Sequence, residues 1–151
     1  MKTSYNWLQN YIDIPWPPEE LAERLTLAGL EVEEIAVANE VPDGVVIAEI
    51  VARRPHPNAD KLSLCDVSTG SGETIQVVCG APNCDAGVKA PLATVGTVLG
   101  EGFKIKPAKL RGEKSQGMLC SMDEIGLGAD HSGIMELPQD APVGQPLSAY
   151  L

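Results

Sequence analysis

Basic side chains form two clusters along the chain, and their spacing could serve phosphate binding. Five of them fall within eleven residues, opposed only by Glu113: Lys104, Lys106, Lys109, Arg111 and Lys114. A second group surrounds Asp60 and consists of Arg53, Arg54, His56 and Lys61. Lysine offers a compact charge and arginine a planar fork, and both suit phosphate oxygens. A strip of this kind is also the ordinary solvated face of a strand, so the pattern alone leaves two interpretations.

None of the catalytic or nucleotide-binding motifs that we considered has the residue spacing that its chemistry requires. Three glycine pairs begin a dinucleotide-binding fingerprint, but none has the third glycine, so we interpret them as turn residues. The run Gly112–Ser115 resembles the end of a phosphate-binding loop, yet no glycine precedes Lys114 at the spacing of that motif. His131 and Ser132 lie in no nucleophile elbow, and they predict a surface turn with Asp130 as the local acceptor. The sequence therefore predicts no catalytic centre.

The cysteines do not have metal-ligand or redox spacing. Cys65, Cys79, Cys84 and Cys120 contain no C-x-x-C pair, and the chain has only two histidines. We expect reduced thiols that act as small core hydrophobes. Neither a metal nor a cofactor is expected in this chain.

Composition excludes several classes of function. The 151 residues carry 21 acidic and 11 basic side chains, for a formal net charge of -10. This balance argues against a histone-like or polybasic nucleic-acid binder. No run approaches the ~18–20 consecutive apolar residues of a membrane helix, and no secretory core follows the N-terminus. We expect a cytoplasmic protein that contacts neither membrane nor DNA.

The first 39 residues differ in character from the rest, since they hold four of the six aromatic side chains. Ser4 can cap a helix over Tyr5–Tyr11, and Pro18–Ala28 predicts a second helix. The alternation over Leu30–Val37 predicts a bulged or edge strand. A piece of this size lies below the ~40 residues that fold without metal, disulfide or partner. We therefore expect residues 1–39 to dock on something.

From residue 40 onward, short β runs alternate with turn residues and predict a small five-stranded barrel. The expected strands are Val45–Arg53, Lys61–Ser68, Thr74–Cys79, Val88–Val95 and Gly102–Lys109. Ser121–Ile125 predicts a short capped helix, and 140–146 a closing loop. The expected fold class is mainly β with an α+β leader, and the expected domains are residues 1–39 and 40–151.

The barrel favours the phosphate-binding interpretation of the basic strip. Small five-stranded barrels commonly bind oligonucleotides on one strand face and its loops. Aromatic stacking is the usual source of single-strand affinity, but residues 40–151 contain only Phe103 and Tyr150 as aromatics. If this barrel binds RNA, we expect it to read backbone and shape.

Three ordered motifs resemble the tRNA-binding domain shared by several tRNA-linked proteins. They are His56–Leu62 (HPNADKL), Val78–Asn83 (VCGAPN) and Lys109–Ser121 (KLRGEKSQGMLCS). In that family the domain is an oligonucleotide/oligosaccharide-binding (OB) barrel that recognises tRNA by shape. The opening of the chain, Ser4–Leu8 with Leu27–Glu33, is similar to the start of bacterial phenylalanyl-tRNA synthetase β subunits, whose barrel is inserted into a first domain. The resemblance implies that residues 1–39 are the first part of a discontinuous N-terminal domain.

The resemblance implies a role in an ATP-dependent ligase that joins phenylalanine to its tRNA as an α2β2 tetramer. The expected partners are tRNA, the synthetase α subunit and the remainder of the β subunit. ATP and magnesium are expected only in the parent enzyme, whose catalysis lies on the α subunit. The expected phosphate contacts are Arg53, His56, Lys61, Lys104, Lys106, Lys109, Arg111 and Lys114. The turn Ser115, Gln116, Gly117 and Met118 is a further candidate, although loop capping explains it equally well.

Two other functions stay open at this point. The acidic remainder of the chain could dock synthetase subunits or domains without touching RNA. A free-standing, structure-specific tRNA-binding protein is a third possibility, which the aromatic-rich first part disfavours.

Overall fold

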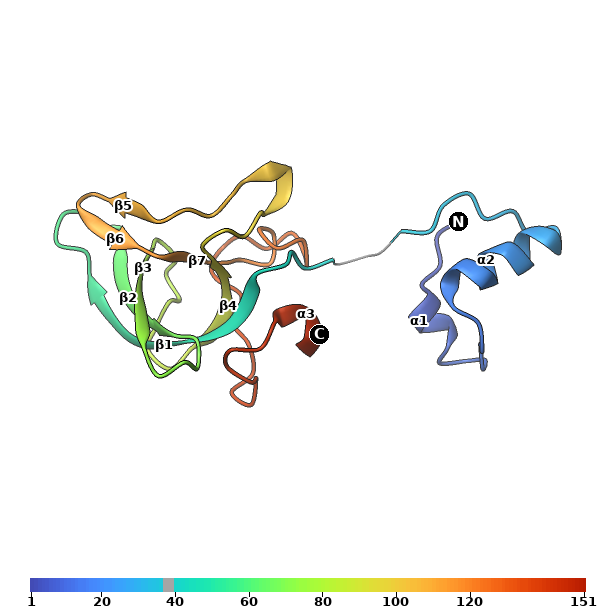
Figure 1. Ribbon diagram of the computed structural model, residues 1–151, viewed down its shortest axis with the longest axis horizontal. Helices are drawn as coiled ribbons and strands as arrows, with labels where there is room; N and C mark the ends of the chain where they lie inside the picture. Colours follow the sequence, from blue (N-terminus) through green and yellow to red (C-terminus); the bar gives the residue numbers. More distant parts are fainter. Residues whose placement is uncertain (37–39) are drawn as a thin grey trace. The chain divides into compact units, whose positions relative to one another are not determined.

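The computed structural model describes residues 1–36 and 40–151, which fall into two units, Met1–Ala38 and Asn39–Leu151 (Figure 1). Across the described residues, no helix is long and apolar enough to cross a membrane. Val37, the last residue of the predicted leader strand, lies outside the described residues.

The first unit contains two helices, α1 (Tyr5–Leu8) and α2 (Pro18–Leu27). The backbone N–H of Trp7 donates to Ser4 Oγ at 3.3 Å, so the predicted cap forms, but α1 ends three residues earlier than predicted. The second helix ends in a Schellman motif. Its signature is the 2.8 Å hydrogen bond from the N–H of Leu30 to the carbonyl of Leu25, with Gly29 at a φ of +99°.

The predicted strand after α2 is absent from residues 30–36. A strand requires a neighbour for its backbone hydrogen bonds, and the first unit contains no other extended segment that pairs with this one within its described part. Large apolar side chains of this unit stay exposed, Leu27 at 82% and Tyr11 at 70%, and Ile14 is its one buried apolar residue among those described.

The second unit is a nearly closed antiparallel barrel of OB type (Figure 1). Its five strands run in the order β3-β2-β1-β4-β7, and a separate two-stranded sheet pairs β5 with β6. The strands are β1 (Val45–Pro55), β2 (Ser63–Ser68), β3 (Thr74–Cys79), β4 (Lys89–Thr94), β5 (Ala108–Leu110), β6 (Glu113–Ser115) and β7 (Gly117–Leu119). The first four match the predicted strands to within two residues at each end.

The predicted fifth strand, Gly102–Lys109, is wrong. Residues 100–102 form a 3-10 turn, η1 (Gly100–Gly102), and the fifth barrel strand is β7. Gly117 opens β7 at a φ of +154°, where an added Cβ would lie 3.0 Å from the carbonyl oxygen of Ala93 on β4. Glycine therefore permits the close approach of β7 to β4, at a position where sequence patterning disfavours a strand.

Two buried clusters hold the barrel unit together. One lies inside the barrel, because it draws residues from all five strands: Ala48, Ile50, Cys65, Val67, Val77, Cys79, Ala90, Leu92 and Leu119. The other packs the start of β1 against later segments through Val45, Ile47, Ile105, Leu137 and Leu147. All four thiols are buried and free, as predicted. Burial raises the pKa of Cys65 and Cys79 to about 12, so these thiols stay neutral core groups.

The segment after β7 is mostly loop. Ser121 and Glu124 form a reciprocal capping box, but residues 122–126 make turns only, so the helix predicted there is wrong. The chain instead adds a short helix, α3 (Leu147–Tyr150), after the predicted closing loop. Lys89 on β4 donates to the carbonyls of Gln139 and Ala141, which ties this segment to the barrel.

Candidate nucleic-acid interface

The most basic part of the barrel unit is the hairpin formed by β5, Arg111, Gly112 and β6, which we call the basic hairpin. Leu110 pairs with Glu113, so Arg111 and Gly112 are the two turn residues. Both have positive φ, 51° for Arg111 and 87° for Gly112, as a type I′ turn requires. Asparagine and glycine favour such positions, whereas arginine adopts this conformation at a cost of about 1 kcal/mol. The turn holds a strained arginine at its tip.

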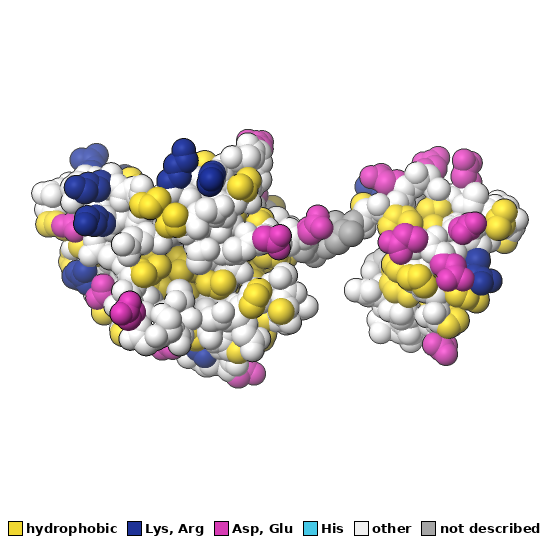
Figure 2. Space-filling model, in the orientation of Figure 1, with side chains coloured by type: hydrophobic (Ala, Val, Ile, Leu, Met, Phe, Trp, Pro, Cys, Tyr) yellow, Lys and Arg dark blue, Asp and Glu magenta, His cyan; other side chains and the backbone are white. Residues whose placement is uncertain are grey.

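Lys109 and Lys114 lie directly opposite each other in the basic hairpin. Like charges at opposed positions of an antiparallel pair destabilise it. Both side chains are exposed, and among the described residues no carboxylate lies within ion-pair distance of Lys109, Arg111 or Lys114. Figure 2 shows Lys and Arg side chains gathered over this part of the barrel. The hairpin thus concentrates positive charge that the protein itself does not neutralise.

The basic hairpin is fastened to the loop between β1 and β2 (residues 56–62, the first loop). His56 is 5% exposed, and its Nε2 lies 2.8 Å from the carbonyl oxygen of Leu110. Its Nδ1 accepts from the backbone N–H of Asn58, which assigns the proton to Nε2 as donor to Leu110. The Asn58 side chain donates to the carbonyl of Arg111 at 3.1 Å. Two side chains of the first loop therefore fix the backbone that carries Arg111.

Strand β3 fastens the other side of the hairpin. Gln76 Nε2 donates to the carbonyl of Lys114 at 2.8 Å, and the backbone carbonyl of Gln76 accepts from the N–H of Gln116 at 2.9 Å. Ser115 is buried, and its Oγ accepts from the N–H of Val78 at 3.1 Å. These bonds bring β3 and β6 together and nearly close the barrel.

The predicted cations therefore separate into two kinds. On β1, Arg53 forms a 2.7 Å ion pair with Asp85 and also donates to Ser63 and Pro82. Its neighbour Arg54 forms a 2.7 Å ion pair with Asp66. The hydrogen bond to each carboxylate raises the pKa of both guanidinium groups. The charges of Arg53 and Arg54 are therefore balanced by carboxylates of the same protein.

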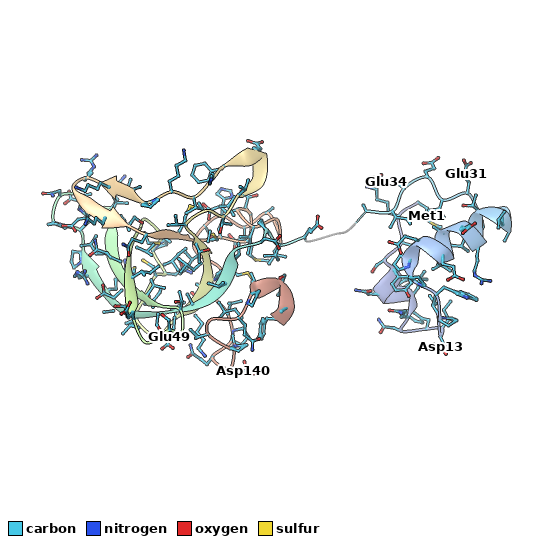
Figure 3. The ribbon with its side chains drawn as sticks, viewed as in Figure 1. Met1, Asp13, Glu31, Glu34, Glu49 and Asp140 are labelled. Atoms are coloured by element: carbon cyan, nitrogen blue, oxygen red, sulfur yellow. The ribbon has the colours of Figure 1, made fainter. Side chains whose placement is uncertain are left out.

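Three further predicted cations are free of such pairing. Lys61 in the first loop, and Lys104 and Lys106 before β5, are exposed, with no ion pair to a described carboxylate. Two acidic side chains lie among these cations, Glu113 on β6 and Asp60 in the first loop. Glu49 and Asp140 occupy the side of the barrel away from the basic hairpin (Figure 3). Basic side chains thus outnumber acidic ones in the basic hairpin and the first loop, on a unit that has a net negative charge.

The other predicted contacts face inward. His56 is buried, and both of its ring nitrogens are occupied by partners within the protein. Ser115 is buried, Gly117 lies against β4, and Met118 packs on a core cluster; only Gln116 of this turn is exposed. Sequence reasoning did not identify Gln76 as a positioning residue. A polar side chain within the apolar run of β3 was the one available signal.

No group of three or more potential metal ligands occurs in the described part of the chain. The predicted turn at His131 is present: Ser132 donates to Asp130 from both its N–H and its hydroxyl, which lowers the pKa of Asp130. The side chains that can bind an external ligand are therefore the unpaired cations of the basic hairpin, of the first loop and of the segment before β5.

Curated relatives match the whole chain. Phenylalanine–tRNA ligase β subunits of Salinibacter ruber, Xanthomonas campestris and Chlorobaculum tepidum are 51%, 54% and 50% identical to it. The chain is covered completely, but it spans only 19% of the length of each relative. The resemblance to the N-terminal region of these subunits, seen first in the sequence motifs, is confirmed.

Two solved structures are also similar. A methionyl-tRNA-synthetase-related protein from Pyrococcus horikoshii is 21% identical, with a TM-score of 0.49, over 66% of this chain and 84% of that one. The C-terminal domain of Plasmodium vivax p43 is 18% identical, with a TM-score of 0.48, over 73% and 61%.

A family model described as "Putative tRNA binding domain" matches residues 45–146. The match begins at the first residue of β1 and ends just before α3, so it covers the barrel, the first loop and the basic hairpin. The chain belongs to the tRNA-binding domain family.

Proposed function

We propose that the chain is the tRNA-binding and scaffolding portion of a phenylalanyl-tRNA synthetase β subunit, and that the basic hairpin contacts tRNA phosphates. The opposition of Lys109 and Lys114 carries this proposal, because the pair weakens the hairpin unless an external anion lies between the two charges. Arg111 at the strained tip adds a planar donor fork. Lys61, Lys104 and Lys106 extend the same positive surface.

Binding through these cations requires no base recognition. Phosphate contacts position a protein on RNA, and folded RNA is recognised mainly by its shape. His56, Asn58, Gln76 and Ser115 are positioning residues, since they hold the backbone of the hairpin without facing the ligand. Arg53 supports the barrel through its ion pair and does not contact RNA.

The parent enzyme would supply what this chain lacks. We propose an α2β2 assembly in the cytoplasm in which ATP and magnesium bind outside this chain, and in which the α subunit and the remainder of the β subunit are its protein partners. The 50–54% identity to ligase β subunits supports this assignment.

Fluorescence anisotropy with labelled tRNA tests the proposal. At about 0.7 per phosphate contact, four engaged cations give a slope near -3 for log K against log salt. Lys114→Gln should make that slope shallower by about 0.7, whereas Lys2→Gln removes one charge from the first unit and should leave it unchanged. No anisotropy change at low salt would exclude direct tRNA binding.

A second candidate function rests on the first unit. Its exposed apolar side chains, which include Trp7, Tyr11, Leu27 and Leu30, suit a protein docking surface, and its seven acidic groups oppose RNA binding. Recovery of the α subunit in a pull-down should fall without residues 1–39, and also with Tyr11→Ser/Leu30→Ser. Equal recovery of all forms would count against docking through this unit.

A further inference from the structure

An irregular hairpin between β4 and β5, residues 96–105, presents a second kind of surface on the barrel unit; we call it the aromatic loop. Its backbone is closed by hydrogen bonds from Gly96 to Ile105 (2.8 Å), from Ile105 to Thr97 (2.8 Å) and from Leu99 to Phe103 (2.7 Å). The side chains of Thr97, Leu99 and Ile105 are buried and anchor the loop on the barrel. The tip is therefore held in place.

Phe103 stands on this anchored loop with 58% of its surface exposed. It is the one phenylalanine in the chain, and leaving its ring in water forfeits the free energy that burial would provide. Val98, which forms a β-bridge with Lys104, is also exposed, at 51%. An exposed aromatic on a rigid support suits contact with a ligand rather than packing.

The charges next to Phe103 narrow the class of ligand. Lys104 and Lys106 follow it in sequence and are exposed, with no ion pair to a described carboxylate. Glu101, two residues before Phe103, is the only acidic side chain between residues 95 and 111. A flat apolar ring beside two free cations complements a ligand that joins a flat base to a phosphate. A phosphate ion alone would make no use of the exposed ring. An apolar peptide would make no use of the two lysine charges.

We propose that Phe103 is a stacking site for an unpaired nucleobase, with Lys104 and Lys106 holding the adjoining phosphates. The proposal rests on the proposed tRNA-binding function and narrows its ligand to RNA in which unpaired nucleotides adjoin a helical part. The basic hairpin holds the helical part through phosphates alone, whereas the aromatic loop captures a base. Stacking tolerates every base, because each has a π-face, so no sequence preference is expected.

The test uses the 151-residue chain and two RNA stem-loops that share one stem. One is blunt, and the other carries a four-nucleotide 3′ overhang with 2-aminopurine in it. The native chain should bind the overhang RNA about tenfold more tightly and quench the 2-aminopurine fluorescence. Phe103→Ala should abolish both effects and leave the affinity for the blunt RNA within about twofold, because it removes no charge.

Two further variants separate stacking from loop structure. Phe103→Trp keeps an aromatic face and should retain both the preference and the quenching, whereas Val98→Ala removes a neighbouring exposed apolar side chain and should change neither. Equal affinity of the native chain for the two RNAs, or undiminished quenching with Phe103→Ala, overturns the stacking site while tRNA binding stands. An equal loss of both RNAs in Phe103→Ala also overturns it. Failure of the native chain to bind tRNA or either stem-loop overturns the proposed function and the stacking site together.

Discussion

Two groups of cations on the same barrel have opposite relations to the rest of the protein. Arg53 and Arg54 on β1 each form a 2.7 Å ion pair with a carboxylate from elsewhere in the unit. Lys109 and Lys114 on the basic hairpin instead oppose each other, beside an arginine with positive φ. The ion pairs of the β1 group stabilise the barrel, whereas the opposed charges of the hairpin group destabilise the hairpin. Charges that destabilise the fold and form no ion pair within it are typical of a binding surface, whereas paired charges are typical of a structural one.

The two groups look alike in the sequence because each is a short run of basic residues. What separates them is the position of the carboxylates, Asp66 and Asp85, which reach Arg54 and Arg53 from 12 and 32 residues away. Charge density along the chain is thus a weaker sign of RNA binding than unpaired charge on the folded surface.

The largest effect is expected where positioning is removed and every cation stays. His56→Ala deletes both hydrogen bonds of the ring and leaves the carbonyl of Leu110 and the N–H of Asn58 without partners. We expect the free energy of unfolding of the barrel unit to fall by about 2–3 kcal/mol in urea denaturation. Affinity for tRNA should fall as well, although no phosphate contact is deleted.

The matched control is His131→Ala, which removes an exposed histidine of the same unit. Its unfolding free energy should stay within about 0.5 kcal/mol of the native value, and its tRNA affinity should be unchanged. If His56→Ala weakens tRNA binding without loss of stability, His56 would be a direct contact rather than a positioning residue.

The next effect compares the two cation groups directly through charge-matched double variants. Lys109→Gln/Lys114→Gln should weaken tRNA binding by about tenfold near 50 mM salt and make the salt slope shallower by about 1.4. Arg53→Gln/Arg54→Gln removes the same charge and should leave affinity within about twofold, but it should lower the free energy of unfolding because both ion pairs are lost. Anisotropy and urea denaturation together measure this contrast. Equal losses of affinity in the two variants would show that RNA binding depends on net charge and not on which cations are unpaired.

The smallest effect has opposite signs for stability and binding. Arg111→Gly relieves the positive φ of the turn and should raise the free energy of unfolding by about 0.5–1 kcal/mol. The same change removes a phosphate donor and should weaken tRNA binding several-fold. Arg111→Ala keeps the backbone strain and should weaken binding equally without the gain in stability. If Arg111→Gly raises the free energy of unfolding and leaves the affinity for tRNA unchanged, Arg111 is not part of the interface.

The sequence predicts most of the barrel but not the strand that closes it. Strands β1 to β4 follow from apolar runs bounded by turn residues. Residues 102–109 show a similar pattern, yet Lys104 makes only an isolated bridge with Val98, and β7 takes the place beside β4. Strand pairing depends on which segment can approach closely, and Gly117 provides that approach without any periodicity. The leader strand fails for the converse reason, since a pattern without a partner forms no ladder.

The candidate site shows the same division between local and long-range information. Exposed cations such as Lys109 and Lys114 can be found from composition, because charge and exposure go together. The inward role of His56 cannot, because its partner Leu110 lies 54 residues away and offers only a backbone carbonyl. The sequence therefore locates the exposed charges more reliably than the groups that hold them in place.

The bond between His56 and Leu110 also has a consequence for synthesis of the protein. Its two ends are separated by 54 residues, and the bond between Asn58 and Arg111 spans 53. A chain emerging from the ribosome exposes the first loop well before the segment that it must hold. The first loop and the basic hairpin are thus joined only after nearly all of the barrel has left the ribosome, and a partly made chain lacks this finished surface.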